Sequence, residues 1–413
     1  MKWLIVEDAL RDSKGHWYEY LRTFYHELRR LGDESFLLSD RATEPFIISE
    51  LGACPVLPQS IWRRTNDGAG ALRRAARIPS HAWRTYRAVR SILREESEYD
   101  VIFVPTVSVH HLLAWAVLAK GLLRRRKTSL LLMFIILPVD VDASTGRAAW
   151  DRSPTSFLLK ILLQWLRPEI RSGRVLLGAE PLTLQRAFAE LIQLPVKSLP
   201  QPVHCYIPLR SHTGGPPRRI SMACYGAARA EKGSDLLQHA IVEFLTAYPT
   251  SDTRFILRWV EDFVGDDGRI VRMDPRLKAD RRVVLLDHFF VGDEYSEALA
   301  QTDVMILPYR LHSYRLRGSR VALEAMVNGI PLIAPRESSI AEQMNEYGAG
   351  VLFEDGNVAS LVEAIVSMHR DFGAVRRQAE ARRAAARAEF SIERFRSIVF
   401  PGTLPARASG PQP

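Results

Sequence analysis

The residue types best suited to chemistry lie in a small basic loop that precedes a predicted helix. Arg317, Gly318 and Ser319 form the loop, and Glu324 follows about one and a half turns into the helix. A helix N-terminus collects unpaired N–H groups and the positive end of the helix dipole, so this loop suits a phosphate. Glu324 is placed to reach a sugar hydroxyl beside that phosphate. The stretch therefore predicts a site for a ligand that carries both groups.

Two further cations, Arg229 and Lys232, lie in a loop that follows a predicted strand and is bracketed by Gly226 and Gly233. In a parallel sheet such a loop lies at the carboxyl edge, where cations can neutralise the charge that grows on a departing diphosphate. Arginine and lysine are also common in exposed loops that have no function. The two glycines and the later basic loop favour the functional interpretation.

The elements that must position these residues are strands that alternate with helices. This order predicts parallel sheets covered by helices on both faces. In the first half, strands are expected at residues 2–6, 34–38, 101–104, 129–137 and 175–178. In the second half, they are expected at residues 219–225, 254–260, 283–289, 304–308, 330–334 and 350–353. The predicted fold class is α/β, with two doubly wound, Rossmann-like domains that face each other across a cleft.

The domain boundary is predicted at residues 211–219, which combine turn-forming residues with charge and lack an apolar pattern. This linker separates an N-terminal domain, residues 1–210, from a C-terminal domain, residues 220–385. Residues 386–402 are expected to form a C-terminal helix that packs back on the N-terminal domain, and residues 403–413 a disordered tail. The carboxyl ends of both sets of strands would line the cleft, where ligands of this architecture bind.

The composition of the 413-residue chain leaves room for two hydrophobic cores, since 47% of its residues are hydrophobic. An excess of 56 Lys and Arg over 47 Asp and Glu gives a net charge of +9, which favours anionic partners. Cys54, Cys205 and Cys224 are odd in number and far apart, which argues against a disulfide framework and fits a reducing cytosol. The N-terminal apolar run is too short for a secretory signal. We therefore expect a cytoplasmic protein.

An arginine-rich region at residues 63–94 contains interleaved apolar residues, and Pro79 is expected to break it into two pieces. A basic, partly amphipathic region of this kind can lie on an anionic membrane surface. A solvated helical face is an equally good interpretation. The basic run at residues 124–127 would extend the same surface. No bilayer-spanning helix is expected, because Pro105 interrupts the most apolar region, residues 101–123.

The C-terminal motifs also resemble those of a known family. Across residues 219–365 the chain looks like the donor domain of retaining GT-B glycosyltransferases, in the large sucrose synthase-like and lipid mannosyltransferase-like family (glycosyl transferases group 1). The first half is similar at the level of the fold. The motifs that carry the resemblance are Gly226, Arg229, Glu231-Lys232-Gly233, residues 303–309, Gly318-Ser319, Leu323-Glu324-Ala325 and Gly329-Ile330-Pro331.

The resemblance implies roles for the candidate residues. Arg229 and Lys232 would hold the donor pyrophosphate and act as the catalytic groups. Glu324 would bind the nucleotide ribose, and the backbone amides of Gly318 and Ser319 would face the phosphates.

The resemblance also points to a first-domain residue and to a departure from the family pattern. Gly15, in the first loop of the acceptor domain, would lie close to the diphosphate. Leu316 stands where the family usually has a second glutamate that contacts the donor sugar. Tyr314, Arg317 and Ser319 are the residues expected to compensate for that carboxylate.

Histidines near strand ends are candidates for the acceptor side of the predicted cleft, namely His16, His110 and His111. A lone histidine near an apolar segment is more often structural. Asp140 and Asp142 have the D-x-D spacing by which another class of glycosyltransferase holds a divalent metal, but two acids in a strand-end turn are more often caps. We expect no metal and no cofactor. NTPase, zinc-protease and α/β-hydrolase motifs do not occur in the sequence.

The function implied is transfer of a sugar, with retention of configuration, from a nucleoside diphosphate to an acceptor that is a lipid-linked or polysaccharide precursor. The expected partners are the nucleotide-sugar donor, the saccharide or lipid-linked acceptor and an anionic membrane surface on the inner face of the membrane. Nucleic acid is not expected, because no nucleic-acid module is recognisable. The alternative is a catalytically inactive GT-B-fold protein that binds an anion or nucleotide, and Leu316 is the residue that favours it.

Overall fold

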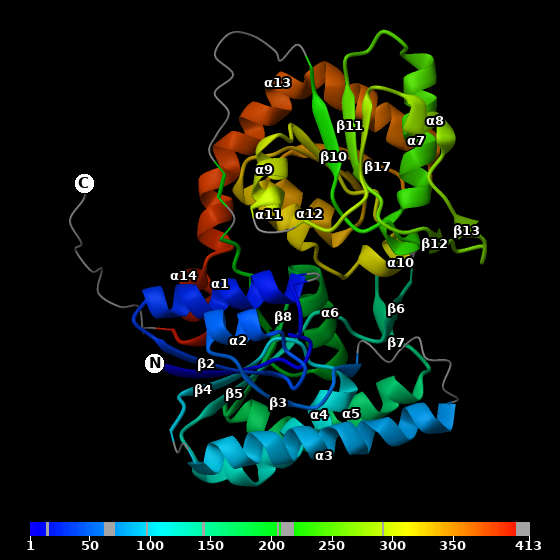
Figure 1. Cartoon of the computed structure of the whole chain (residues 1–413). Helices are drawn as coiled ribbons and strands as arrows, with labels where there is room; N and C mark the ends of the chain where they lie inside the picture. Colours follow the sequence, from blue (N-terminus) through cyan, green and yellow to red (C-terminus); the bar gives the residue numbers. More distant parts are fainter. Residues whose placement is uncertain are drawn as a thin grey trace, which may run out of the picture. The chain divides into compact units, whose positions relative to one another are not determined.

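The computed structural model describes residues 1–13, 16–61, 71–95, 98–142, 145–204, 206–207, 219–290 and 293–401. The chain forms two compact units, one of Met1–Pro202 with Ile392–Pro413 and one of Val203–Ser391 (Figure 1). Gly15, Cys205, the tail over residues 403–413 and the predicted linker up to residue 218 lie outside the described residues. Among the helices that are described, none is both long and apolar enough to cross a bilayer.

The first unit is built on a seven-stranded parallel sheet with the order β3-β2-β1-β4-β5-β8-β9. Its strands are β1 (Lys2–Val6), β2 (Glu34–Asp40), β3 (Cys54–Leu57), β4 (Val101–Val104), β5 (Ser129–Phe134), β8 (Val175–Ala179) and β9 (Lys197–Ser198). β6 (Val139–Val141) and β7 (Ala148–Trp150) form a separate antiparallel hairpin. Successive strands are added on one side of β1 up to β3 and then on its other side from β4, so the direction of winding changes between β1 and β4.

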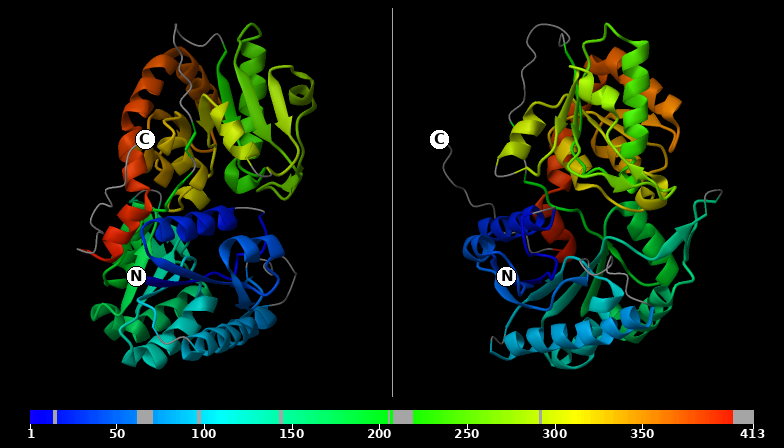
Figure 2. Two further views of the ribbon diagram at one scale, coloured as in Figure 1. Left: turned by 60° about the vertical axis from the view of Figure 1, so that its left-hand side comes forward. Right: turned by 45° about the vertical axis from the view of Figure 1, so that its right-hand side comes forward.

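Helices cover both faces of this sheet. α1 (His16–Arg30) and α2 (Pro45–Leu51) lie on one side, and α3 (Ala71–Glu95), α4 (Val109–Lys120) and α5 (Pro154–Arg171) lie on the other (Figures 1 and 2). α4 packs between α3 and α5. The short helix η2 (Leu122–Arg125) follows α4, and α6 (Leu182–Ile192) joins β8 to β9.

The expected break at Pro79 is wrong, because α3 continues through this residue as one helix. A proline inside a helix removes one backbone hydrogen bond and crowds the preceding turn. The packing of α3 against α4 compensates for that loss, since the buried residues Ala82, Val89 and Leu93 recur at helical spacing and give α3 a continuous apolar face.

After the second unit, the chain returns to the first unit as α14 (Ile392–Val399). Its Phe395 ring packs edge-on against Phe24 of α1, with 4.8 Å between ring centroids, and lies 5.3 Å from Phe103 of β4. Arg396 donates from Nε to the buried carboxylate of Asp33 at 2.9 Å, and Trp3 Nε1 donates to the same carboxylate at 2.9 Å. The helix therefore completes the core of this unit.

The second unit is built on a six-stranded parallel sheet with the order β14-β11-β10-β15-β16-β17. Its strands are β10 (Ser221–Cys224), β11 (Arg254–Arg258), β14 (Val283–Leu286), β15 (Val304–Ile306), β16 (Leu332–Pro335) and β17 (Gly350–Phe353). β12 (Phe263–Val264) and β13 (Ile270–Val271) form an antiparallel hairpin. The direction of winding changes between β10 and β15.

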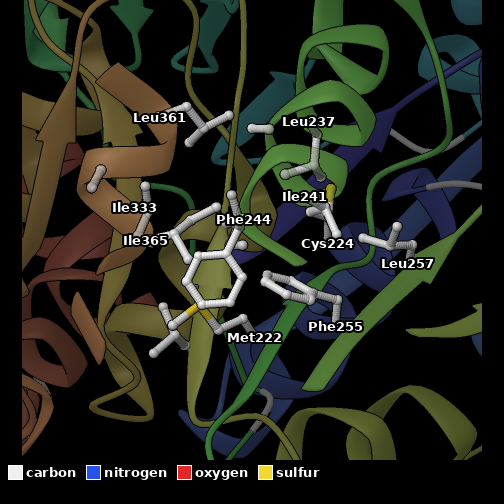
Figure 3. Close-up of a cluster of buried hydrophobic side chains, with 14 of the residues drawn as sticks. Met222, Cys224, Leu237, Ile241, Phe244, Phe255, Leu257, Ile333, Leu361 and Ile365 are labelled. Atoms are coloured by element: carbon white, nitrogen blue, oxygen red, sulfur yellow. The ribbon is translucent and has the colours of Figure 1, made fainter. Parts of the chain in front are cut away.

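Two hydrophobic layers enclose the second sheet. One layer packs the strands against α7 (Ser234–Ala247), α8 (Pro275–Ala279) and α13 (Val358–Glu389), and Figure 3 shows its centre, where Phe244, Phe255 and Met222 meet. The other layer packs the strands against α9 (Glu294–Ala300), α11 (Arg320–Val327) and α12 (Ser339–Tyr347). The short helices η3 (Ala230–Lys232) and α10 (Leu311–Tyr314) lie in the loops after β10 and β15. The predicted α/β class, with two doubly wound domains, is confirmed.

Candidate active site

The candidate site in the second unit lies where the direction of winding changes. β10 and β15 are neighbouring parallel strands, with Met222 opposite Val304, so the loops that follow them leave the same edge of the sheet. The loop after β10 carries Arg229 and Lys232, and the loop after β15 leads to Arg317. Loops that diverge at such a point leave room for a ligand at the carboxyl ends of the strands.

The two loops touch at Gly233. This residue has a φ of +62°, and a Cβ atom there would lie 1.8 Å from the carbonyl oxygen of Pro308. Only glycine allows both this backbone conformation and this approach. The Arg310 N–H also donates to the carbonyl oxygen of Glu231 at 3.0 Å. These contacts fix the position of Lys232 relative to the end of β15.

Lys232 lies at the centre of a group of cations. Its Nζ atom lies 5.6 Å from the centroid of the Tyr309 ring. Burial lowers the pKa of Lys232 to about 8, and the positive charges of Arg229, Arg258 and Arg317 act in the same direction. Such mutual repulsion raises the energy of the unliganded site, so an anion bound among these side chains would be stabilised.

Arg229 is the most exposed of these cations, and one carboxylate balances part of its charge. Its Nη1 atom lies 3.6 Å from Glu231 Oε1, and the Arg229 side chain retains 61% of its accessible surface. An exposed pair of this kind contributes little to stability. Arg229 is therefore able to leave Glu231 for a stronger anionic partner.

Arg258, which no sequence motif singles out, joins this group of cations. It is the last residue of β11, the strand next to β10, and its guanidinium lies 5.7 and 5.6 Å from the ring centroids of Phe289 and Phe290. Its Nε atom is buried and has no hydrogen-bond partner among the described residues, and burial lowers its pKa. A cation at the end of an apolar strand that adjoins the first strand was the available signal.

The basic loop ahead of α11 has the geometry expected for a helix N-cap. Ser319 precedes the helix and its Oγ atom accepts from the Ala322 N–H at 3.4 Å. Gly318 lies between this cap and Arg317, whose guanidinium lies 5.3 Å from the Tyr314 ring centroid. Tyr314 is buried, which raises its pKa, and its ring packs on Tyr309 with 4.3 Å between centroids. The Arg317 guanidinium therefore stacks over the ring of the buried Tyr314.

Glu324 is buried on α11, and two donors hold its carboxylate. Tyr295 of α9 donates its hydroxyl to Oε2 at 2.5 Å, and Arg320 donates from Nε to Oε1 at 2.9 Å. Tyr295 was not among the predicted residues, because its contact with Glu324 spans 29 positions and depends on how α9 packs. The two donors fix the orientation of the Glu324 carboxylate.

Comparison with known proteins finds a family similarity within the second unit. Residues 219–371 match the family described as Glycosyl transferases group 1. The matched stretch lies entirely within the second unit. The match includes Arg229, Lys232 and Glu324. No curated protein sequence matches the chain significantly.

Solved structures show that the whole chain has the GT-B fold. Sucrose-phosphate synthase from Thermosynechococcus elongatus aligns with a TM-score of 0.60 at 15% identity and covers 97% of this chain and 96% of its own. A glycosyltransferase from Rickettsia africae aligns with a TM-score of 0.63 at 13% identity, and the alignment covers 96% of this chain and 95% of the Rickettsia chain. Anabaena HepE in complex with UDP-glucose aligns with a TM-score of 0.59 at 15% identity, and the alignment covers 96% of this chain and 98% of the HepE chain. At these identities the likeness concerns the fold.

The first unit of this GT-B chain has a polar cluster at its own change of winding, after β1 and β4. Asp8 follows β1, and its Oδ2 atom lies 3.0 Å from His111 Nε2 of α4 and 2.9 Å from His81 Nε2 of α3. Burial works against ionisation of Asp8, but His111 and His81 outweigh it and lower the pKa of the carboxyl well below its usual range. Burial raises the pKa of the neighbouring Glu7 to about 8, so that carboxyl is largely protonated at neutral pH.

The acceptor-side candidates fare differently. His111 is buried and has both ring nitrogens engaged, because Nδ1 accepts from the Ser108 N–H at 3.2 Å. His110 is half-buried, and burial is the main reason that its pKa falls to about 4. His16 is the first residue of α1, but its side chain lies outside the described residues, as does Gly15.

The donor atoms of Asp8, His81 and His111 lie within 4.8 Å of one another, which is close enough for a shared metal ion. A metal-bound histidine donates its other ring N–H to an acceptor. At His111, Nδ1 lies 3.2 Å from the Ser108 backbone nitrogen and 3.0 Å from the Ser108 hydroxyl oxygen. Asp8, His81 and His111 thus form a hydrogen-bonded cluster centred on the Asp8 carboxylate.

The D-x-D pair lies at the β6–β7 hairpin. Asp140 is exposed within β6. Asp142 accepts from the Thr145 N–H at 2.7 Å and from its hydroxyl at 2.9 Å, which closes a turn. These contacts give Asp142 a turn-forming role.

Proposed function

We propose that this protein is a glycosyltransferase that moves a sugar from a nucleoside diphosphate to an acceptor. The observation that carries the proposal is the group formed by Lys232, Arg229, Arg258 and Arg317, whose charges repel one another at the carboxyl edge of a group 1 domain. A diphosphate would relieve that repulsion. Glu324, held by two donors, would accept hydrogen bonds from the ribose.

The reaction that we propose proceeds with retention of configuration, which rests on the resemblance to the family. The bond between the anomeric carbon and the donor phosphate breaks, and its electron pair leaves with the diphosphate. The acceptor oxygen forms the new bond on the same face, and its proton passes to the departing diphosphate. Lys232 and Arg229 stabilise the negative charge that develops on the diphosphate. Such electrostatic stabilisation is strongest in a site from which water is excluded. No metal or other cofactor is required in this scheme.

The donor and acceptor classes that we propose rest on one similar solved structure and on the charge of the chain. Anabaena HepE was solved with UDP-glucose, which makes uridine diphosphate sugars the first donors to test. For the acceptor we propose a saccharide or lipid-linked precursor of a polysaccharide, met by a cytoplasmic protein at the anionic inner face of a membrane. The basic character of the chain, with a net charge of +9, supports this location.

The proposal is tested by measuring donor binding and donor cleavage together. UDP and UDP-sugars should raise the melting temperature of the wild-type protein, because they bind only the folded state. Slow hydrolysis of the UDP-sugar should accompany binding. In Lys232→Ala the affinity for UDP and the rate of UDP-sugar hydrolysis should each fall by at least about tenfold, since a charge-assisted contact is lost. Lys278→Ala, which changes an exposed lysine of α8, is the matched control.

A second candidate function is nucleotide binding without transfer, favoured by Leu316 at the position where the family usually has a glutamate. In that case nucleoside diphosphates would stabilise the protein through Lys232. No donor sugar would then be released under any condition, even with acceptor present.

A further inference from the structure

The outer face of α5 in the first unit exposes three large apolar side chains in one row. Phe157, Ile161 and Trp165 keep 64%, 47% and 44% of their accessible surface. They are four residues apart, so they lie one above another along the helix. The opposite face of α5 is buried through leucines that include Leu159 and Leu166. The exposed row is therefore additional to the core-facing stripe, and such rows on a water-exposed surface usually mark an interaction site.

The charged residues exposed beside this row on α5 are cations. Lys160 and Arg171 are exposed on the helix, and Arg152 is exposed just before it. The acid within the helix, Glu169, is buried and is neutralised by Lys120, at 2.7 Å, and by Arg174, at 3.4 Å. A helix with an apolar row, flanking cations and no exposed carboxylate over residues 154–171 has the composition of helices that lie in the plane of a lipid interface.

Neighbouring elements extend the same chemistry. The Arg174 guanidinium donates to the carbonyl oxygen of Arg124 in η2 at 3.5 Å, which brings the basic residues 124–127 to the C-terminal end of α5. α4, beside α5, exposes Val117, and α3, beside α4, exposes Trp83. The three helices form one layer on the sheet, so their outward sides face the same direction (Figure 1).

We propose that the α5 surface, defined as Phe157, Lys160, Ile161, Trp165 and Arg171, binds directly to an anionic lipid bilayer. The aromatic and aliphatic side chains enter the interface between headgroups and acyl chains, and the cations pair with lipid phosphates. Tryptophan suits this depth because its ring is largely apolar while its N–H remains hydrogen-bonded to headgroups or water. Positive charge without an intervening carboxylate selects a lipid surface over a protein surface of mixed charge.

This inference deepens the proposed function and rests on it for one point, the biological purpose of bilayer binding. A bilayer-bound enzyme would meet a lipid-linked acceptor at the surface to which it is bound. Binding to the bilayer needs neither donor nor transfer. The two proposals can therefore fail separately.

The test is flotation of the full-length protein with vesicles of phosphatidylcholine alone or of phosphatidylcholine mixed with phosphatidylglycerol. The wild-type protein should float with the mixed vesicles and much less with the neutral ones, and high salt should weaken the effect. Phe157→Ser/Trp165→Ser and Lys160→Glu/Arg171→Glu should each reduce the bound fraction at least about tenfold. Val264→Ser/Ile270→Ser is the matched control, because both residues are exposed in the β12–β13 hairpin of the other unit.

Three outcomes would overturn the inference. One is a wild-type protein that stays with neither kind of vesicle, and another is an α5 double variant that binds mixed vesicles as well as the wild type does. The third is self-association that the Phe157→Ser/Trp165→Ser change abolishes in the absence of lipid, which would make this surface a contact between copies. The far-UV circular dichroism spectrum and stabilisation by UDP are measured in every variant. An unchanged spectrum shows that the variant is folded, and persistent stabilisation shows that the proposed donor site is intact.

Discussion

At the scale of single residues, the candidate donor site depends on charges that the fold forces together. Lys232 has a pKa lowered to about 8, first by burial and then by Arg229, Arg258 and Arg317. In the proposed function, a bound diphosphate would restore the ordinary preference of lysine for its charged form. The repulsion among these cations would then be relieved, so these residues would favour anion binding more than they favour folding.

This leads to a pH dependence of binding. The Kd for UDP should be constant below about pH 8 and should rise about tenfold for each further pH unit, because only protonated Lys232 attracts the anion. The rise ends at the higher pKa of the bound state. Lys232→Arg should show a flat profile over the same range, since arginine stays charged. Isothermal titration calorimetry from about pH 6 upward measures both, and a wild-type Kd that does not change above about pH 8 would contradict the assignment.

The residues of the site differ in how well the sequence reveals them. Arg229, Lys232 and Arg317 belong to short local patterns of glycines, cations and a helix start, and the structure brings them together. Arg258 and Tyr295 come from separate elements, β11 and α9, and reach the site only through sheet order and helix packing. Contacts between distant elements leave no periodic signal in a single sequence. The same reason hides the contact between Asp8 and His81, which are 73 positions apart.

At the scale of elements, the close approach of the loops after β10 and β15 brings together residues of the candidate donor site. Gly233 permits this approach, and no other residue could occupy its position without pushing Pro308 away.

Most long strands were predictable because buried parallel strands are continuous apolar runs. β3, β9 and the two hairpins were not predicted. β9 and the hairpin strands have two or three residues and lie outside continuous apolar runs, and β3 is an edge strand that contains Pro55.

Replacing this glycine should separate folding from binding. Gly233→Ala should cost roughly 1–3 kcal/mol of stability, from backbone strain and the clash with Pro308, and should weaken UDP binding at least about tenfold. Gly268→Ala is the matched control, because Gly268 has a φ of +79° but nothing within 4 Å of a Cβ atom. Urea denaturation and UDP titration are run on both variants. Equal effects of the two changes on UDP binding would show that loop contact does not position the site.

At the scale of the whole molecule, the chain enters the second unit at Val203 and returns to the first at Ile392. Its return is secured by Arg396 and the buried Asp33, together with the packing of Phe395. Glu393 of the same helix pairs with Arg30 at the surface. The buried pair and the exposed pair therefore offer a direct comparison within one helix.

The two pairs should differ in what their loss costs. Asp33→Ala removes the buried carboxylate that pairs with Arg396 and should lower the free energy of unfolding of the first unit by about 3–5 kcal/mol. Glu393→Ala should change it by less than about 1 kcal/mol, because exposed pairs contribute little. Calorimetry with and without UDP distinguishes the two units, since only the transition of the second unit should shift with ligand. A cost for Asp33→Ala as small as that for Glu393→Ala would rule out this account of how α14 is anchored.

The return of α14 also constrains the order in which the molecule can form during synthesis. The second unit is continuous in sequence, so all of it has left the ribosome before the last helix of the first unit emerges. Until then Phe24 and Phe103 lack the ring that covers them. The nascent chain must keep its N-terminal half incomplete while the C-terminal half matures, and a fragment ending at Pro202 would expose that unfinished core to aggregation.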